Sequence, residues 1–421
     1  MSAHLSLRHR SFAYLTRHLS SSPFSTAATT SKIPTLYEPT AATTTQDDDA
    51  PTTTLQLLSW GKGASGQLGG GIEEIRLYPT PVANLVVPTS SFTLSSSQGR
   101  IQTPNCSNQE SNADRSIVEV GISCGLFHSS LLVDGKLWIW GKGDGGRLGF
   151  GHENSLFLPT LNPNLDSVRF VALGGLHSVA LTATGEFYTW GYGGFGALGH
   201  SVYTRELFPR LVEGSWSGKI CHISTSGTHT GAITESGELY TWGRDEADGR
   251  LGLGPNRGPN EGGGLSIPSK VKALHMPVAA VSYGGFFTMA LTEDGELWNW
   301  GDEGKVLSWG HGGHGQLGNS SLQSQKTPTA VEALTDGCVI YIACGGSSSA
   351  AITDKGKLYM WGYTIDSQLG VPGLPEIQPS PVEVKFLMED DGLGAHNVLS
   401  VAVGASHAMC LVLRSVCKIS R

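Results

Sequence analysis

The sequence predicts an all-β fold, a β-propeller built from a unit that recurs about every 50 residues. Three observations lead to it. A strand ending in Trp-Gly recurs along the chain, and each time a glycine-rich turn ending in Leu-Gly follows. A second half-motif of small and apolar residues comes after each turn. Glycine makes up 57 of the 421 residues, nearly twice the ordinary share, as expected where tight turns join short strands.

The first half-motif has six clear copies, and their spacing sets the size of the unit. Trp140 and Trp190 are 50 residues apart, and Trp190 and Trp242 are 52 apart. Glycine-containing turns such as VDG and ESG join the second half-motif to the next Trp strand, which is typical of β-hairpins. Because four short strands cannot bury their own faces, such units are expected to stack radially. The copies are LLSWGKGASGQLG (57–69), LWIWGKGDGGRLG (137–149), FYTWGYGGFGALG (187–199), LYTWGRDEADGRLG (239–252), VLSWGHGGHGQLG (306–318) and LYMWGYTIDSQLG (358–370).

Two repeated positions are predicted to be structural. The Trp before Gly is expected to pack between neighbouring sheets, at Trp60, Trp140, Trp190, Trp242, Trp300, Trp309 and Trp361. A His in the second half-motif is expected to satisfy backbone groups within its own blade, at His128, His177, His229 and His407. A metal-binding ring of histidines is disfavoured, because the equivalent residues in the other two repeats are Phe287 and Ser348.

No residue set indicates a catalytic site, a cofactor or a metal. The glycine-rich stretches lack the Gly-Lys-Ser/Thr ending of a phosphate-binding loop, and each precedes a strand rather than a helix. The His-containing turn GHGGHG (310–315) is at most an adventitious metal site. The chain is therefore expected not to be an enzyme.

The two ends of the repeat region are expected to share one blade. The last half-motif, VAVGASHAMCLVL (401–413), has no Trp-Gly strand after it, whereas the first unit begins with LQLLSWG (55–61). The N-terminal strand is predicted to complete the last blade. We place the propeller at residues 55–413 and a short tail at 414–421.

One unit is interrupted. Trp300 and Trp309 are only 9 residues apart, so two Trp-Gly strands adjoin where the body of a repeat should separate them. The ordinary spacing predicts roughly 40 further residues between Gly301 and Asp302. We interpret this as the loss of an exon from a transcript or gene model whose parent protein has seven blades. The alternative is a genuine six-bladed ring with a short insertion.

A second irregularity is the 80-residue gap between Trp60 and Trp140. It holds residues 87–116, a stretch rich in Ser, Gln and Asn, which predicts a disordered surface insertion.

The N-terminus differs from the rest. Residues 1–31 hold three Arg, many Ser and Thr, and no acidic residue, which is typical of an organellar transit peptide. We favour import into the mitochondrial matrix, with the chloroplast as the alternative. Residues 32–54 read as a polar linker.

Charge and hydropathy narrow the class of partner. The formal charge is −8, and it falls to −11 once residues 1–31 and their three Arg are removed. This balance argues against DNA binding and against broad contact with RNA phosphates, although it leaves local basic patches open. No apolar run is long enough for a transmembrane helix. The seven cysteines form no CxxC pair and are expected to be free thiols.

The pattern of the two half-motifs resembles the regulator of chromosome condensation repeat. The resemblance covers about residues 55–413 and implies a propeller that ordinarily has seven blades, of which six complete repeats occur here. Members with a mitochondrial leader are associated with transcript processing, intron splicing in plants or ribosome assembly, and through these with respiratory complexes. By this resemblance the chain would be a scaffold for RNA-processing or ribosome-assembly proteins.

The resemblance also leaves an alternative in another class, namely a guanine-nucleotide exchange factor for a small GTPase. The chain lacks the basic tail of the nuclear members. The Trp-rich motifs of the ultraviolet-B photoreceptor are also missing, since the matching positions read GLFHS, GGLHS, SGTHT and GASHA. Photoreception is therefore disfavoured.

Overall fold

The fold is known from a computed structural model of the whole chain. Residues 33–421 form one compact unit. Within that unit the structure describes residues 33–39, 52–89, 92–95, 118–244, 251, 253, 264–272, 278–283, 288–292, 307–310, 312–323, 325–334, 339–386 and 396–414. The transit-peptide prediction for residues 1–31 and the tail 415–421 therefore fall outside the described residues.

The described residues confirm an all-β propeller, whose helical content is limited to the short 3-10 turns η1 (Asp144–Gly146) and η2 (Glu332–Leu334). Three blades are four-stranded sheets in which each strand pairs with the next along the chain. The first consists of β9 (Val168–Leu173), β10 (His177–Thr182), β11 (Phe187–Gly191) and β12 (Glu206–Leu211). The second consists of β13 (Ile220–Thr225), β14 (His229–Thr234), β15 (Leu239–Arg244) and β16 (Gly264–Lys270). The third consists of β21 (Val339–Cys344), β22 (Ser348–Thr353), β23 (Leu358–Tyr363) and β24 (Ile377–Glu383). A fourth blade has the same plan in β5 (Val118–Cys124), β6 (His128–Val133), β7 (Lys136–Gly141) and β8 (Leu156–Leu161).

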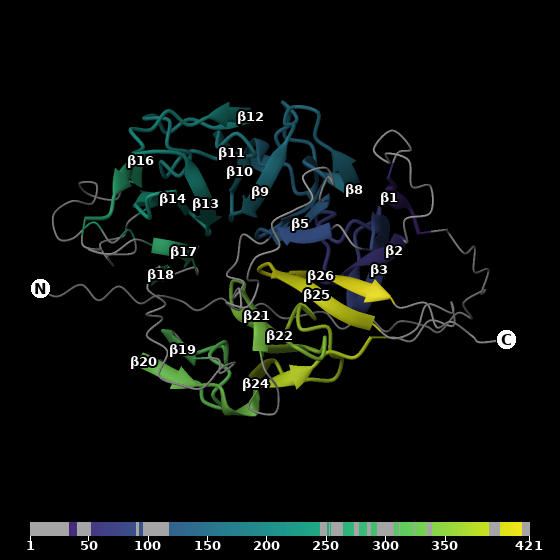
Figure 1. Ribbon diagram of the computed structural model, residues 1–421. Coiled ribbons are helices and arrows are strands. Elements are labelled where there is room, and N and C mark those ends of the chain that lie inside the picture. The colour runs from purple at the N-terminus through teal and green to yellow at the C-terminus, as the bar shows by residue number, and fades with distance from the viewer. Residues whose placement is uncertain are drawn as a thin grey trace, which may run out of the picture. The chain divides into compact units, whose positions relative to one another are not determined.

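The closing blade joins the two ends of the chain, as the sequence predicts. Its strands are β25 (His396–Val403), β26 (His407–Arg414), β2 (Thr52–Lys62) and β3 (Ile75–Pro88). The β2 and β26 strands are antiparallel, with Leu55 opposite Leu413 and Gly61 opposite His407. Figure 1 shows the yellow C-terminal strands beside the purple N-terminal ones.

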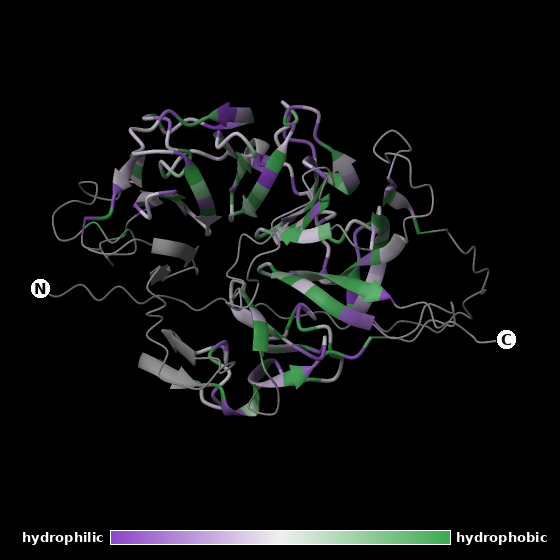
Figure 2. Cartoon of the chain, viewed as in Figure 1, coloured by the Kyte–Doolittle hydropathy of each residue, from purple (hydrophilic) through white to green (hydrophobic). Residues whose placement is uncertain are grey.

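Burial is greatest in the second strand of a blade and least in the last strand. The first strand of each blade contacts the first strand of the next, as β5 does with β9 and β25 does with β5. The second strands β6, β10, β14 and β22 are buried along their whole length, and Figure 2 shows most of β26 as hydrophobic. The last strands are more exposed and carry proline, for example Pro159 and Pro209. Proline suits such an edge because it lacks the N–H that would template pairing with another chain.

Two sheets of the described residues have only two strands. They are β17 (Val278–Tyr283) with β18 (Thr288–Thr292), and β19 (Leu307–Gly310) with β20 (Gln325–Ala330). The first pair corresponds to the opening half of a blade and the second to the closing half. The junction at Gly301 and Asp302 lies between them, outside the described residues.

Two short strands lie in segments that the sequence assigns to irregular chain. The β1 strand (Thr35–Tyr37) lies in the predicted linker and pairs in parallel with β3. The β4 strand (Phe92–Ser95) lies in the predicted insertion and pairs in parallel with β5, where Phe92 and Leu94 pack against the core. The few apolar residues of these strands pair with the edge strands β3 and β5. This pairing depends on the assembled sheets and cannot be predicted from composition. Among the described residues there is no helix of the length and hydropathy that a membrane span requires.

Candidate functional site

The repeated Trp residues join neighbouring blades through a shared backbone acceptor. Trp190 on β11 is fully buried, and its indole N–H donates to the carbonyl oxygen of Arg147, in the Leu-Gly turn of the preceding blade, at 2.9 Å. The acceptor is always the residue before Leu-Gly. The other indole bonds are Trp140 to Gln67 (3.0 Å), Trp242 to Ala197 (2.8 Å), Trp361 to Gln316 (2.9 Å) and Trp60 to Gln368 (2.8 Å). Trp300 lies outside the described residues, and Trp309 lies in β19, where only the backbone is described.

A hydroxyl group adds a second bond to the same carbonyl. Ser178 Oγ donates to the Arg147 carbonyl at 2.8 Å and lies 2.9 Å from Nε2 of His128 in the preceding blade. The same triplet recurs at two further seams, and we call this arrangement the inter-blade clamp. Its members there are His407, Ser129 and the Gln67 carbonyl, and His177, Thr230 and the Ala197 carbonyl.

The side chains of His128, His177 and His407 therefore form hydrogen bonds with a hydroxyl group of the next blade, whereas the sequence predicted bonds to backbone groups within their own blade. Since the single hydroxyl proton of Ser178 is used on the Arg147 carbonyl, Nε2 of His128 must carry the proton that it donates to Ser178. The Nδ1 atoms of His128, His177 and His407 are buried and have no hydrogen-bond partner among the described residues. These rings are thus held in the neutral form.

Burial sets the pKa of these histidines. Loss of hydration lowers the pKa of His177 and of His407 to about 3, and that of His128 falls well below its ordinary value. The nearby Arg147 cation lowers the pKa of His177 and His128 further. Neutral imidazoles locked into hydrogen bonds are structural groups rather than acid–base catalysts.

Glycine before the His motif allows neighbouring blades to approach closely. A Cβ on Gly174 would lie 2.4 Å from the Ser226 carbonyl oxygen of the next blade, and one on Gly125 would lie 2.4 Å from the Gly174 carbonyl oxygen. Across these contacts Gly175 N donates to Ser226 O at 3.0 Å. Only glycine leaves room for this backbone bond.

Among the described residues, the seam between the β21–β24 blade and the closing blade lacks the clamp. Ser348 stands there at the His position and Ala408 at the hydroxyl position, so the Gln368 carbonyl accepts from the Trp60 indole instead. His229 is fully buried and lies 2.8 Å from Ser226 Oγ through Nδ1.

The cysteines of the described residues do not form a nucleophilic site. Cys124, Cys221, Cys344 and Cys410 are free thiols. Burial raises the pKa of Cys124, Cys344 and Cys410, which disfavours the thiolate. Within the described ranges no three His, Cys, Asp or Glu side chains come together as metal ligands do.

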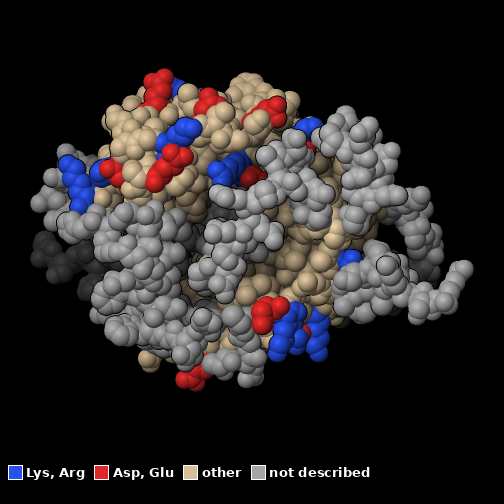
Figure 3. Space-filling model, in the orientation of Figure 1, with Lys and Arg blue, Asp and Glu red and all other residues tan. Residues whose placement is uncertain are grey.

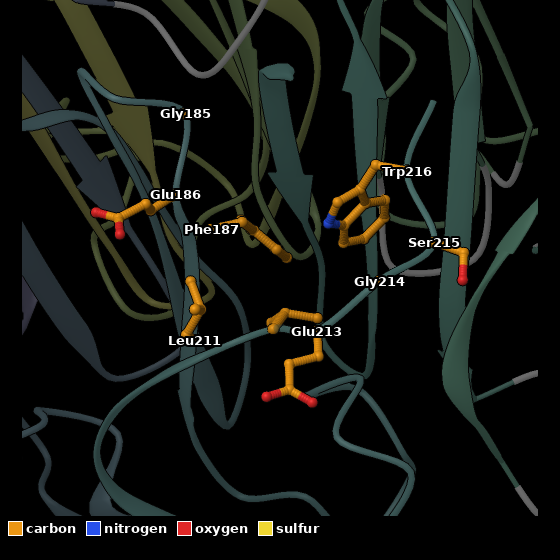
Figure 4. A pocket seen from close by; sticks show the side chains of 9 residues that line it. Gly185, Glu186, Phe187, Leu211, Glu213, Gly214, Ser215 and Trp216 are labelled. Atoms are coloured by element: carbon orange, nitrogen blue, oxygen red, sulfur yellow. The ribbon is translucent and has the colours of Figure 1, made fainter. Parts of the chain in front are cut away.

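A shallow surface pocket of about 540 Å³ lies where β11 begins and β12 ends. Figure 4 shows the side chain of Phe187 pointing toward Trp216, with Glu186 and Glu213 on either side of Leu211. Trp216 lies in the connection between β12 and β13 and is outside the repeat pattern, since Ser217 rather than Gly follows it. That departure is the signal by which sequence reasoning could have found it.

A family model described as RCC1-like domain matches residues 50–410. The chain is 58% identical, over 459 aligned positions, to the Arabidopsis thaliana protein named RCC1 domain-containing protein RUG3, mitochondrial. That alignment covers 98% of this chain and 100% of the relative.

Solved structures share the fold. Human WBSCR16 superposes with a TM-score of 0.53 at 22% identity, covering 86% of this chain and 99% of that one. Prp20p from Saccharomyces cerevisiae, described by its binding to Gsp1p and histones, gives 0.52 at 16% identity, covering 86% and 92%. At these identities the likeness concerns the fold alone.

Proposed function

Because the chain belongs to the RCC1-like domain family, we propose that it is a non-enzymatic protein-interaction scaffold in the mitochondrial matrix. It supports organellar RNA processing, such as intron splicing, or ribosome assembly, and so respiratory-complex biogenesis. The observation that carries the proposal is the 58% identity, over 98% of this chain and all of the relative, to a plant protein named mitochondrial. The Arg-rich, acid-free leader at residues 1–31 agrees with that location.

The charge distribution favours protein partners over broad RNA contact. The formal charge is −8, and several basic side chains of the described surface form ion pairs within and between blades. Examples are Lys62 with Asp366, Arg205 with Glu153, and Lys270 with Glu238. Figure 3 shows acidic and basic groups interspersed on one face. Since RNA affinity rises with the number of phosphates that are neutralised, such a surface supports an adaptor role.

Affinity purification of the tagged full-length chain from isolated mitochondria, with and without RNase, tests this function. RNA-processing or ribosome-assembly proteins are expected to co-purify and to survive RNase, because the scaffold holds them through protein contacts. Recovery of a single small GTPase without RNA machinery would contradict the proposal and favour nucleotide exchange.

We further propose that this chain lacks one repeat of a parent protein whose propeller has seven blades. In the four-stranded blades the second strand pairs with the third, as β10 does with β11, whereas β18 and β19 belong to separate two-stranded sheets. The alignment with the plant relative spans 459 positions but uses about 413 of the 421 residues (98%), which leaves about 46 positions without a counterpart here. Sequencing of full-length transcripts is expected to recover a longer form; recovery of the short form alone would contradict the missing unit.

A further inference from the structure

The floor of the surface pocket is an ordered aromatic cluster. Phe187, 2% exposed, meets Trp216 edge to face, with ring centroids 6.3 Å apart. Trp216 also packs against Tyr240 at 5.2 Å and Trp242 at 6.1 Å. These contacts fix the indole of Trp216, which remains half-buried beside the exposed side chain of Leu211. The pocket thus offers a preformed apolar and aromatic surface.

The rim of the pocket carries two carboxylates without an ion-pair partner. Glu186 and Glu213 are exposed, and neither forms an ion pair within 4 Å with any side chain that the structure describes. Glu206 is paired with Arg210 and Glu238 with Lys270, whereas the Glu186 carboxylate accepts a hydrogen bond from the Thr184 hydroxyl at 3.1 Å. Two carboxylates whose charge is not balanced by an ion pair therefore lie at the edge of the aromatic surface.

Two glycines shape the walls of the pocket. Gly214 lets the chain pass close to the Trp216 indole, since a Cβ there would lie 2.3 Å from the ring, and Gly185 has a φ of +86° that favours glycine. One cation of the chain lies nearby, since a Cβ on Gly185 would lie 3.4 Å from Cβ of Lys219.

We propose that this pocket binds a lysine or arginine side chain of a partner polypeptide. The methylene stem would lie against the exposed side chain of Leu211, and the charged head would lie between Trp216 and the carboxylates of Glu186 and Glu213. A neutral side chain of the same shape would gain the apolar contact but not the charge-assisted bonds. The proposal rests on the scaffold function for the source of this side chain.

The test uses full-length protein labelled with 5-fluorotryptophan, in which the Trp216→Phe variant assigns the ¹⁹F resonance of Trp216. Nα-acetyl-arginine methyl ester and its neutral analogue Nα-acetyl-citrulline methyl ester are titrated at constant ionic strength. The arginine ester is expected to shift the Trp216 resonance saturably, and citrulline is expected to bind on the order of fivefold more weakly.

Charge variants make the test specific. The Glu186→Gln/Glu213→Gln double variant is expected to weaken arginine binding on the order of fivefold, because both carboxylates are lost. Lys219→Gln is expected to strengthen it, since a competing cation is removed. The matched control is Glu73→Gln/Asp354→Asn, which removes two exposed acids from other blades and is expected to leave binding unchanged.

Equal shifts with arginine and citrulline, or equal affinity in the Glu186→Gln/Glu213→Gln and control variants, would overturn the proposal. Such a result would leave the scaffold function standing, because co-purification from mitochondria measures that function independently of this pocket.

Discussion

Replacement of Trp140 by alanine is expected to lower the free energy of unfolding by about 3–5 kcal/mol. Trp140 is fully buried at the seam between the closing blade and the β5–β8 blade. The change removes its packing and leaves the Gln67 carbonyl with Ser129 as its clamp donor. Urea unfolding followed by circular dichroism measures the loss.

Two further variants separate packing from hydrogen bonding. Trp140→Phe keeps an aromatic ring but loses the N–H donor, and about 2 kcal/mol is expected to be lost. Trp138→Ala is the matched control on the same strand, because Trp138 is only partly buried and its indole has no clamp acceptor among the described residues. Equal losses for Trp138→Ala and Trp140→Ala would contradict the clamp as a source of stability.

Lowering the pH from 7 to 5 is expected to destabilise the propeller strongly. The pKa of His177 and of His407 is about 3 in the folded protein, because both are buried, whereas an unfolded histidine titrates near 6.5. The unfolded state therefore takes up protons below pH 6.5 while the folded rings stay neutral, so stability is full above pH 6.5 and falls as the pH drops toward 3. Each such histidine is expected to cost about 2 kcal/mol between pH 7 and pH 5.

The His177→Asn variant tests this assignment. Asparagine does not titrate, so the variant is expected to be less stable at pH 7 but to lose about 2 kcal/mol less than the parent chain between pH 7 and pH 5. Urea unfolding at a series of pH values measures both. The same pH dependence in variant and parent would contradict a neutral buried His177.

Much of the fold could be predicted because the repeat makes each local pattern recur. Trp-Gly and Leu-Gly mark the third strand and the turn after it in every complete blade, and the unpaired half-motif at residues 401–413 predicts the closure by β2. The bonding partners could not be predicted, because they belong to neighbouring blades. A visible signal was the Ser or Thr after the repeated His or Ser, at Ser129, Ser178, Thr230 and Ser349, which supplies the hydroxyl donor.

Features that occur only once in the chain, outside the 50-residue repeat, could not be predicted because no recurring pattern marks them. Trp216 occurs once, in a connection between blades, and its partners Tyr240 and Phe187 lie in different sheets. The short β4 strand depends on a free edge of β5, which is a property of the assembled sheet. Neither follows from a local pattern.

The mitochondrial purification tests the central claim, a protein scaffold in organellar RNA metabolism, most directly. A version without residues 1–31 is its control, because it is expected to remain outside mitochondria. The account predicts that RNA-processing or ribosome-assembly proteins co-purify with the full-length chain in equal amounts before and after RNase. Their loss on RNase treatment, or recovery of one GTPase in their place, would contradict it.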